Sequence, residues 1–579
     1  MPRWTLTLDG RSLPPVGLIG GKAWSVARMM ALGLPVPPAF VITTAACQAF
    51  QETGDMPAGL IDEIRAGMAD LEARTGHSFG GTDRPLLVSV RSGAPVSMPG
   101  MMDTVLNLGI DAVTEPALAR LCNDPVFARD THRRFYDMYG QIVLKAVGAD
   151  CSADGSPETW DAAIRAACGA GVPRTLEGRL IAAVRAVFES WNGRRARRYR
   201  QHHGIDDAMG TAVTIQAMVF GNLDDASGTG VLFTRNPLTG AREPYGEYLP
   251  RAQGEDVVSG RFNPEPLSRM EGLVPEAHAA LMQAAAVLER ENADTQDIEF
   301  TVQHGRLYLL QSRAAKRAPA AAVRIAVEMV DEGMISPATA LARIAPDQVR
   351  LLLAPRLVAE PGPEVPVLAA GEGASPGVGR GVVVMDADTA EARAGQGEAV
   401  VLARPTTSPE DVHGMLVARA VVTETGGATS HAAVVGRALG LPSVVGCGAG
   451  ALAGLAGREV TVDGSKGRVY AGLLAVETPD EAADPLLARL TGWARPLAPL
   501  AVLPLAEAPP DTRDLSRIEG GEDPGRIAAV IAGARALRGG AIGSDEGIRA
   551  AVAAGVRTVY CTPVLPALLA AIRAGEAQG

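Results

Sequence analysis

The chain of 579 residues is long enough for three or four compact units, each with its own core. A formal net charge of -11 argues against a nucleic-acid or anionic-membrane surface, and six cysteines without CxxC spacing argue against disulfides or zinc sites. Hydrophobic residues make up 47% of the chain, which indicates a loop-rich globular protein rather than a disordered one. The N-terminus has no signal-peptide pattern and no apolar run is long enough to span a membrane, so we expect a cytoplasmic α/β multidomain protein.

The first glycine-rich stretch is GLIGGK, residues 17–22. It leads into a predicted helix over 23–32, with Lys22 at the start of that helix and able to reach a phosphate group. The stretch is not a P-loop, because alanine follows Lys22 and the glycine spacing differs. A simple turn is the alternative interpretation.

A buried strand, LLVSV, is predicted over residues 86–90 and ends at Arg91. The following loop, GAPVSMPGMMD, is rich in glycine, proline and methionine, which suits a mobile cover over a substrate. Residues 110–205 then carry apolar residues at helical spacing. Their last helix contains five arginines, at 194, 195, 197, 198 and 200, which we interpret as a solvated helix face rather than a nucleic-acid site.

From residue 211 to residue 316 the pattern favours strands, and the most informative pair is DIEF followed by LLQSR. Alternate residues of a strand share a face, so Asp297 and Glu299 project together, as do Gln311 and Arg313 on the next strand. The turn at 303–305 makes the two strands a hairpin. Carboxylate and amide oxygens suit Mg²⁺ and a guanidinium suits a polyphosphate, although paired acids on a strand more often face solvent.

Residues 318–370 begin with alanine-rich helices and end in a proline-rich stretch, which predicts a hinge. The segment 371–477 follows, with several short valine-rich strands. Within it, a polar Gly426-Gly427 turn precedes a small-residue helix that runs to about Leu439, and His431 lies on the first turn of that helix. Helix N-termini favour anions, and a largely neutral imidazole is a good nucleophile, so His431 is a candidate phosphoryl carrier.

Several of these stretches together resemble pyruvate phosphate dikinase over roughly residues 10 to 475. They are GLIGGK with the following GLPVPPAFVITTAAC, RSGAPVSMPGMMDT, DIEF with LLQSR, and GGATSHAAVVGRALGLPSVVGC. The resemblance implies an ATP-grasp nucleotide-binding domain over 1–317, with a helical subdomain at about 110–205, and a phosphohistidine domain over 371–477. It also implies that Arg91 contacts the ATP phosphates.

The same resemblance implies a first half-reaction in which Mg-ATP binds and His431 attacks its β-phosphoryl group. AMP would be released, and the remaining phosphate would pass to inorganic phosphate or water. The TSH form of the motif favours inorganic phosphate as the co-substrate. The residues that would bind the nucleotide are Lys22, Arg91, Asp297, Glu299, Gln311 and Arg313. Three of these, Asp297, Glu299 and Gln311, would hold the metal.

The remaining residues, 478–579, form a linker and a short α/β tail. The family's PEP/pyruvate domain is a TIM barrel, which takes about 250 residues, so this tail is too short to close one. We therefore expect the phosphoryl group to pass to pyruvate or another acceptor on a separate protein, such as a barrel encoded elsewhere. The alternative is a non-catalytic nucleotide sensor. Thr429 and Ser430 are possible regulatory phosphorylation sites, although capping of the helix is the better explanation of both. The sequence indicates no oligomeric state.

Overall fold

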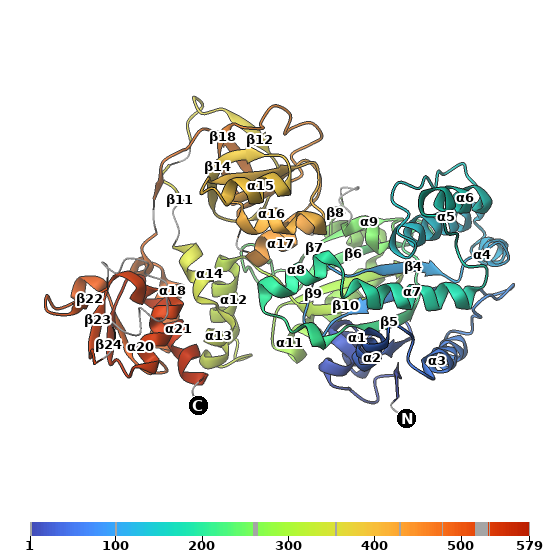
Figure 1. The fold of residues 1–579 in the computed structure, drawn as a ribbon, viewed down its shortest axis with the longest axis horizontal. Coiled ribbons are helices and arrows are strands. Elements are labelled where there is room, and N and C mark those ends of the chain that lie inside the picture. The colour runs from blue at the N-terminus through green and yellow to red at the C-terminus, as the bar shows by residue number, and fades with distance from the viewer. Residues whose placement is uncertain are drawn as a thin grey trace.

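The computed structural model describes residues 3–98, 101–258, 264–353, 356–359, 361–427, 430–439, 441–477, 479–515, 531 and 533–577. Its elements fall into three groups (Figure 1). We call residues 3–317 the Lys22 domain, residues 361–477 the His431 domain, and residues 318–353 with 485–577 the C-terminal unit. The predicted α/β multidomain fold is confirmed.

The first sheet of the Lys22 domain is antiparallel and has the strand order β1-β2-β5-β3-β4. Its strands are Thr5–Leu8 (β1), Ala39–Ile42 (β2), Val88–Gly93 (β3), Thr104–Leu108 (β4) and Ala212–Ala217 (β5). Along β2, Ala39 and Val41 pack in one core with helix α1 (Val16–Ala31), while Phe40 and Ile42 pack in a second core. Both faces of the sheet are therefore buried, as the period-two alternation of side chains requires.

The second core lies under the helices α2 (Thr44–Thr53) and α3 (Leu60–Thr75) and the helical subdomain. The subdomain fills the predicted range with α4 (Thr114–Cys122), α5 (Pro125–Ile142), α6 (Pro157–Cys168), α7 (Leu176–Ser190) and α8 (Arg194–His203). The predicted solvated face of arginines on α8 is wrong for Arg200. This side chain is fully buried, lies 4.1 Å from the Trp191 ring centre and donates to Asp207.

The second sheet has the order β10-β9-β6-β7-β8. Its strands are Gly228–Phe233 (β6), Tyr245–Pro250 (β7), Glu265–Pro266 (β8), Gln296–Gln303 (β9) and Arg306–Ala314 (β10). Helices α1 and α11 (Pro275–Asn292) pack against it. The expectation of strands throughout this region is thus wrong for α11, whose buried Ala277, Leu281 and Leu288 follow helical spacing.

The His431 domain is built on a mixed sheet with the order β12-β19-β18-β14-β15-β16-β17-β13. Its strands are Val367–Ala370 (β12), Glu372–Ser375 (β13), Val378–Val384 (β14), Val400–Arg404 (β15), Ala420–Thr423 (β16), Ser443–Val445 (β17), Glu459–Asp463 (β18) and Arg468–Ala471 (β19). The helices α15 (Ala387–Ala394), α16 (Val412–Val417) and α17 (His431–Leu439) lie towards the Lys22 domain (Figure 1). The predicted helix thus begins at His431.

The C-terminal unit contains a parallel sheet with the order β21-β24-β23-β22. Its strands are Ala501–Leu503 (β21), Arg513–Asp514 (β22), Ala536–Arg538 (β23) and Thr558–Tyr560 (β24). It shares one hydrophobic core with helices from before and after the His431 domain. These are α12 (Pro319–Asp331), α13 (Pro337–Arg343), α14 (Pro346–Leu352), α18 (Pro485–Ala494), α20 (Asp545–Ala553) and α21 (Val564–Glu576).

The chain enters and leaves the His431 domain through two short strands that pair with each other (Figure 1). They are β11 (Arg356–Leu357) and β20 (Val476–Glu477). Because α12–α14 belong to a packed core, the helical part of the predicted 318–370 hinge is held in place. We propose that any hinge movement is concentrated in the connections that contain β11 and β20.

A buried ion-pair cluster joins the C-terminal unit to the Lys22 domain. The fully buried Arg235 lies just after β6, and its guanidinium pairs with Glu289 of α11 at 2.9 Å and with Glu332, just after α12, at 2.8 Å. Glu328 of α12 lies 3.7 Å away. Charges taken out of water need such partners, so the cluster fixes α12 against the Lys22 domain. Among the described residues, no helix is both long and apolar enough to cross a membrane.

Candidate active site

The hairpin of β9 and β10 brings four of the predicted site residues together. Glu299 lies opposite Gln311, and Asp297 lies opposite Arg313, in an antiparallel ladder with an irregularity between Leu309 and Gln311. The turn residues His304 and Gly305 both have positive φ angles. The alternation of the sequence thus produces the expected patch of two carboxylates, one amide and one guanidinium.

Lys22, on helix α1, and Arg91, on strand β3, reach the same patch. The turn before Lys22 packs directly on the end of β3: the Gly21 amide donates to the Ala94 carbonyl at 2.9 Å. Gly20 has φ 73°, and a side chain there would place its Cβ 1.8 Å from the Gly93 carbonyl oxygen. Glycine at position 20 therefore permits the close approach that sets Lys22 beside Arg91.

The charges of this cluster are balanced against one another. Arg91 donates to Glu299 at 3.2 Å, and Arg313 donates to Asp297 at 2.8 Å. Burial would raise the pKa of Glu299, but Arg91, Arg313 and Lys22 together hold that pKa below its usual value. Burial and the neighbouring Arg91 lower the pKa of Lys22 to about 7. Anions that entered here would meet three cationic side chains, while a cation would meet two carboxylates.

The oxygen atoms of the hairpin fit a divalent cation. Gln311 is 5% exposed, and its Oε1 atom has no hydrogen-bond partner among the described residues. Buried polar oxygens without partners are uncommon and indicate a missing ligand. With the two carboxylates on the same patch, this donor set matches the preference of Mg²⁺ for oxygen.

His431 lies at the N-terminus of α17, and its ring is held by the backbone of Ser408. Its Nε2 atom is buried and has no hydrogen-bond partner among the residues described. Burial lowers the pKa of His431 to about 4. At neutral pH the imidazole is therefore uncharged, and a proton on Nδ1 leaves the Nε2 lone pair available.

The His431 domain rests against the Lys22 domain through contacts on both sides of α17. On β7, the Tyr245 hydroxyl donates to Glu372 at 2.8 Å, and Glu247 lies against Gly427, whose Cβ position is 2.7 Å from the Glu247 carboxylate. On α8, Arg195 pairs with Glu410 at 3.1 Å. Gly427, shortly before His431, therefore faces strand β7 of the second sheet.

Sequence reasoning missed Ser408, Arg195 and Glu410. A detectable signal existed for Ser408, because Ser408 and Asp411 form a capping box in which the Ser408 amide donates to Asp411. Arg195 and Glu410 are 215 positions apart in the sequence, and no local pattern connects them. Of the two possible regulatory sites, Thr429 lies outside the described residues. Ser430 is 6% exposed, and its regulatory role stays a prediction.

Comparisons with known proteins match this layout. The family described as "Pyruvate phosphate dikinase, AMP/ATP-binding domain" matches residues 16–58 and 51–269, which include Lys22 and Arg91. The family described as "PEP-utilising enzyme, mobile domain" matches residues 396–467, which include His431. The β9–β10 hairpin lies outside both matched ranges.

Curated relatives are similar to most of the chain. Pyruvate, phosphate dikinase of Rhizobium meliloti (strain 1021) is 42% identical over 86% of this chain and 60% of its own length. The enzyme of that name from Clostridium symbiosum is 39% identical over 88% of this chain and 62% of its own length. Chloroplastic pyruvate, phosphate dikinase 1 of Arabidopsis thaliana is 42% identical over 85% of this chain and 55% of its own length. The chain thus spans about 60% of the length of these relatives, and it carries the AMP/ATP-binding domain of the pyruvate phosphate dikinase family together with the mobile domain of the PEP-utilising enzymes.

Proposed function

We propose that the chain catalyses the Mg-ATP-dependent phosphorylation of its own His431, the first half of a pyruvate phosphate dikinase-type reaction. The observation that carries the proposal is the His431 Nε2 atom, which is buried and without a hydrogen-bond partner among the described residues, on a ring that is uncharged at neutral pH. Buried ring nitrogens without partners are uncommon, and here the unpartnered atom lies at the start of a helix. The position at a helix N-terminus, where backbone amides favour an anion, also suits a phosphorylated imidazole.

The proposed donor site is the cluster of Lys22, Arg91, Arg313 and the acidic hairpin. In the unliganded arrangement, arginines and carboxylates neutralise one another. Bound ATP would take over the guanidinium groups of Arg91 and Arg313, and Asp297, Glu299 and Gln311 would hold Mg²⁺. When bound, Mg²⁺ neutralises polyphosphate charge and polarises the oxygens of the transferring group.

In the proposed step, Nε2 of His431 forms a bond to the β-phosphorus of ATP as the bond between that phosphorus and the α,β-bridging oxygen breaks. AMP leaves with that oxygen. The γ-phosphoryl group then passes to inorganic phosphate or water, which leaves one phosphoryl group on His431. Lys22, Arg91 and Arg313 offset the charge that develops on the leaving AMP and on the transferred group. Positioning and charge neutralisation therefore supply most of the catalysis.

For the second half-reaction, we propose that His431 hands its phosphoryl group to pyruvate or another acceptor bound outside residues 1–579. The relatives are named pyruvate, phosphate dikinases, which supports pyruvate as the first acceptor to test. The connections at β11 and β20 support a movement of the His431 domain between donor and acceptor. A cytoplasmic location agrees with this chemistry.

The test is to incubate the purified chain with Mg²⁺ and ATP labelled at the β-phosphorus. We expect acid-labile, base-stable label on the wild type and none on His431→Ala, with both proteins binding the nucleotide. An unlabelled wild type that still binds Mg-ATP would contradict autophosphorylation and favour a nucleotide sensor. Pyruvate added alone should yield no phosphoenolpyruvate, because the acceptor site is proposed to lie elsewhere.

A further inference from the structure

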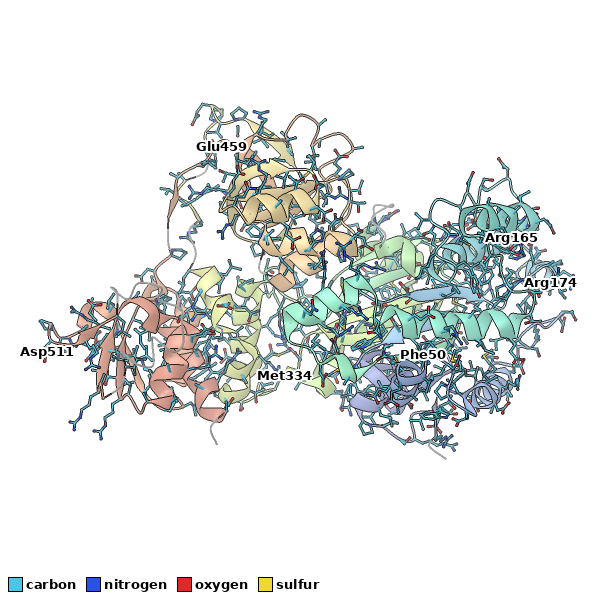
Figure 2. All side chains as sticks on the ribbon, viewed as in Figure 1. Phe50, Arg165, Arg174, Met334, Glu459 and Asp511 are labelled. Carbon is cyan, nitrogen blue, oxygen red and sulfur yellow. The ribbon has the colours of Figure 1, made fainter. Side chains whose placement is uncertain are left out.

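A cavity of about 230 Å³ lies where the Lys22 domain meets the C-terminal unit. Helices α1 and α11 and the open end of the β9–β10 hairpin form its walls on one side, and α13 contributes Arg343 from the other. Met334, which lies between α12 and α13, marks this junction in Figure 2. The cavity shares Arg313 with the candidate ATP site, but its described lining includes neither Lys22 nor Arg91. It is therefore a separate candidate binding site.

The charges that line this cavity are mostly positive. Arg28, Arg313 and Arg343 line it together with one carboxylate among the described residues, that of Asp294. Asp294 already forms a bidentate pair with Arg317, at 2.6 and 3.1 Å, and it lies farther, 3.5 Å, from Arg343. The positive charge of the walls thus exceeds the negative charge, and a cavity lined by one sign of charge favours a ligand of the opposite sign.

Arg28 and Arg343 are the two guanidinium groups that such a ligand would meet first, because Arg313 is paired within the hairpin. Both groups are fixed by the C-terminal end of α11. Arg28 donates to the Glu291 carbonyl at 3.2 Å. Arg343 donates to the Ala293 carbonyl at 2.6 Å. Since these carbonyls are two positions apart, the two guanidinium groups are held near each other before any ligand arrives, which lowers the entropic penalty of binding.

Capping of α11 does not account for all the donors of these arginines. A guanidinium has five N–H groups in a planar fork, and each cap uses one nitrogen atom. The Nε atom of Arg28 is buried and has no hydrogen-bond partner among the described residues. The Glu291 carboxylate lies 3.5 Å from a different nitrogen of the same group. A buried N–H without an acceptor is uncommon, so this atom indicates a missing acceptor at the cavity.

The other walls suit a small anion. The Ser25 hydroxyl accepts from the Ser312 amide at 2.8 Å, so its own proton can be donated to a further acceptor. Trp24, Met29 and Leu288 supply apolar surface. Such surface lowers the local dielectric constant, which strengthens the attraction between an anion and the guanidinium groups, and it can cover a short carbon skeleton.

We propose that this cavity binds a small oxyanion, a phosphate or a carboxylate, between Arg28 and Arg343. The planar fork of a guanidinium matches the paired oxygens of both kinds of anion. Arg28 belongs to the Lys22 domain and Arg343 to the C-terminal unit, so the bound anion joins the two units in addition to the Arg235 cluster. The proposal goes beyond the proposed function, because it involves no phosphoryl transfer.

The test is a calorimetric titration of the full chain with inorganic phosphate. Mg²⁺ and saturating α,β-methylene ATP are present, so that the candidate ATP site is occupied. We expect one phosphate site, and Arg28→Met and Arg343→Met should each weaken it about tenfold or more, because each removes a charged hydrogen-bond donor. Arg290→Met is the matched control with wild-type affinity, because Arg290 is exposed, lies in the last turn of α11 and does not line the cavity.

Malonate titrated in the same way separates a carboxylate ligand from a phosphate ligand, and chloride at equal ionic strength controls for screening. Binding of either oxyanion that both methionine variants weaken supports the site. Unchanged affinity in both variants would overturn the proposal, as would a wild type that binds neither oxyanion more tightly than chloride.

Arg343→Lys keeps the proposal testable if a methionine variant does not fold. It retains the charge but lacks the fork, so its affinity should fall between those of the wild type and Arg343→Met. Wild-type affinity in Arg343→Lys and a stable Arg28→Met would contradict the site. A chain that bound no nucleotide analogue would be titrated without it, and the same comparison of variants would apply. The readout is therefore distinct from a failure to label His431.

Discussion

Arg313 faces Asp297 across the β9–β10 hairpin, with 2.8 Å between the guanidinium Nε and the carboxylate Oδ2. The pair places a group proposed to bind phosphate and a group proposed to bind metal in direct contact, and Arg91 with Glu299 repeats the arrangement beside it. In the proposed function, each arginine exchanges a carboxylate for a phosphate when Mg-ATP binds. Because of this exchange, the charge of the hairpin is the main determinant of how strongly the affinity for ATP depends on Mg²⁺.

Replacing Glu299 with glutamine should separate nucleotide binding from its metal dependence. Arg91 would lose its carboxylate partner, so metal-free ATP should bind more tightly than it does to the wild type. The rate of phosphoryl transfer to His431 should fall by about 10²-fold or more, which is typical when one group that stabilises a transition state is removed. Calorimetry with and without Mg²⁺ and the labelling rate check both effects. Glu276→Gln, on an exposed glutamate of α11, is the control, and equal effects of the two variants would contradict the assignment.

The affinity for ATP should fall as pH rises above 7. The pKa of Lys22 is about 7 in the free chain, and phosphates would raise it, so binding takes up a proton once Lys22 is neutral. The affinity should then drop by up to about tenfold per pH unit from pH 7.5 to 9, with little contribution from Lys22 below pH 6. Calorimetry in buffers of different ionisation enthalpy measures the proton directly.

Lys22→Arg is the control for this pH dependence, because arginine keeps its charge over the whole range. It should bind ATP with a flat profile between pH 7.5 and 9. A profile that is equally steep in wild type and Lys22→Arg would show that another group titrates. His431 should contribute nothing in this range, since its pKa of about 4 leaves it neutral.

Gly20→Ala should destabilise the Lys22 domain and weaken ATP binding. The added Cβ would lie 1.8 Å from the Gly93 carbonyl oxygen, so the turn before Lys22 must move. Gly33→Ala is the matched control, because Gly33 has nearly the same φ, 71°, with open space around its Cβ position. Gly20 also has ψ 162°, a backbone conformation essentially restricted to glycine, so the free energy of unfolding should fall by about 1–3 kcal/mol more in Gly20→Ala. Equal losses in denaturant titrations would contradict the close approach.

Arg235→Met should reduce the free energy of unfolding by about 3–5 kcal/mol, because it leaves buried carboxylates without their cation. Arg242→Met is the comparison. Arg242 pairs with the same Glu332 at 3.5 Å but is 69% exposed, so its loss should change the stability by about 1 kcal/mol at most. Denaturant unfolding measures both. A small effect of Arg235→Met would mean that α12 is held to the Lys22 domain by other contacts.

The local parts of the site were predictable from sequence because they depend on short-range geometry. Alternation alone places Asp297 with Glu299 and Gln311 with Arg313, and the hairpin turn follows from residues between them. The helix that starts at His431 follows from its glycine turn and small residues. Helix α11 was missed, although Pro275 at its first turn and the spacing of its buried residues were visible in the sequence.

The long-range parts were not predictable, because they depend on how separate units meet. Arg200 and Arg195 look alike within one basic helix, yet the first is buried on Trp191 and the second bridges two domains. Arg235 finds its carboxylates on α11 and just after α12, about 54 and 97 positions along the chain. No periodicity in the sequence distinguishes such residues from solvated ones.

The central claim, that His431 Nε2 accepts the β-phosphoryl group of ATP, has one direct measurement. The chain is incubated with Mg-ATP and inorganic phosphate and quenched in alkali; the modified peptide is located by mass spectrometry and the substituted ring nitrogen by phosphorus–nitrogen NMR. The account predicts a single phosphoryl group on Nε2 of His431, because Nε2 is the buried ring nitrogen without a partner among the described residues. A phosphoryl group on Nδ1, on Ser430 or on no residue at all would contradict it.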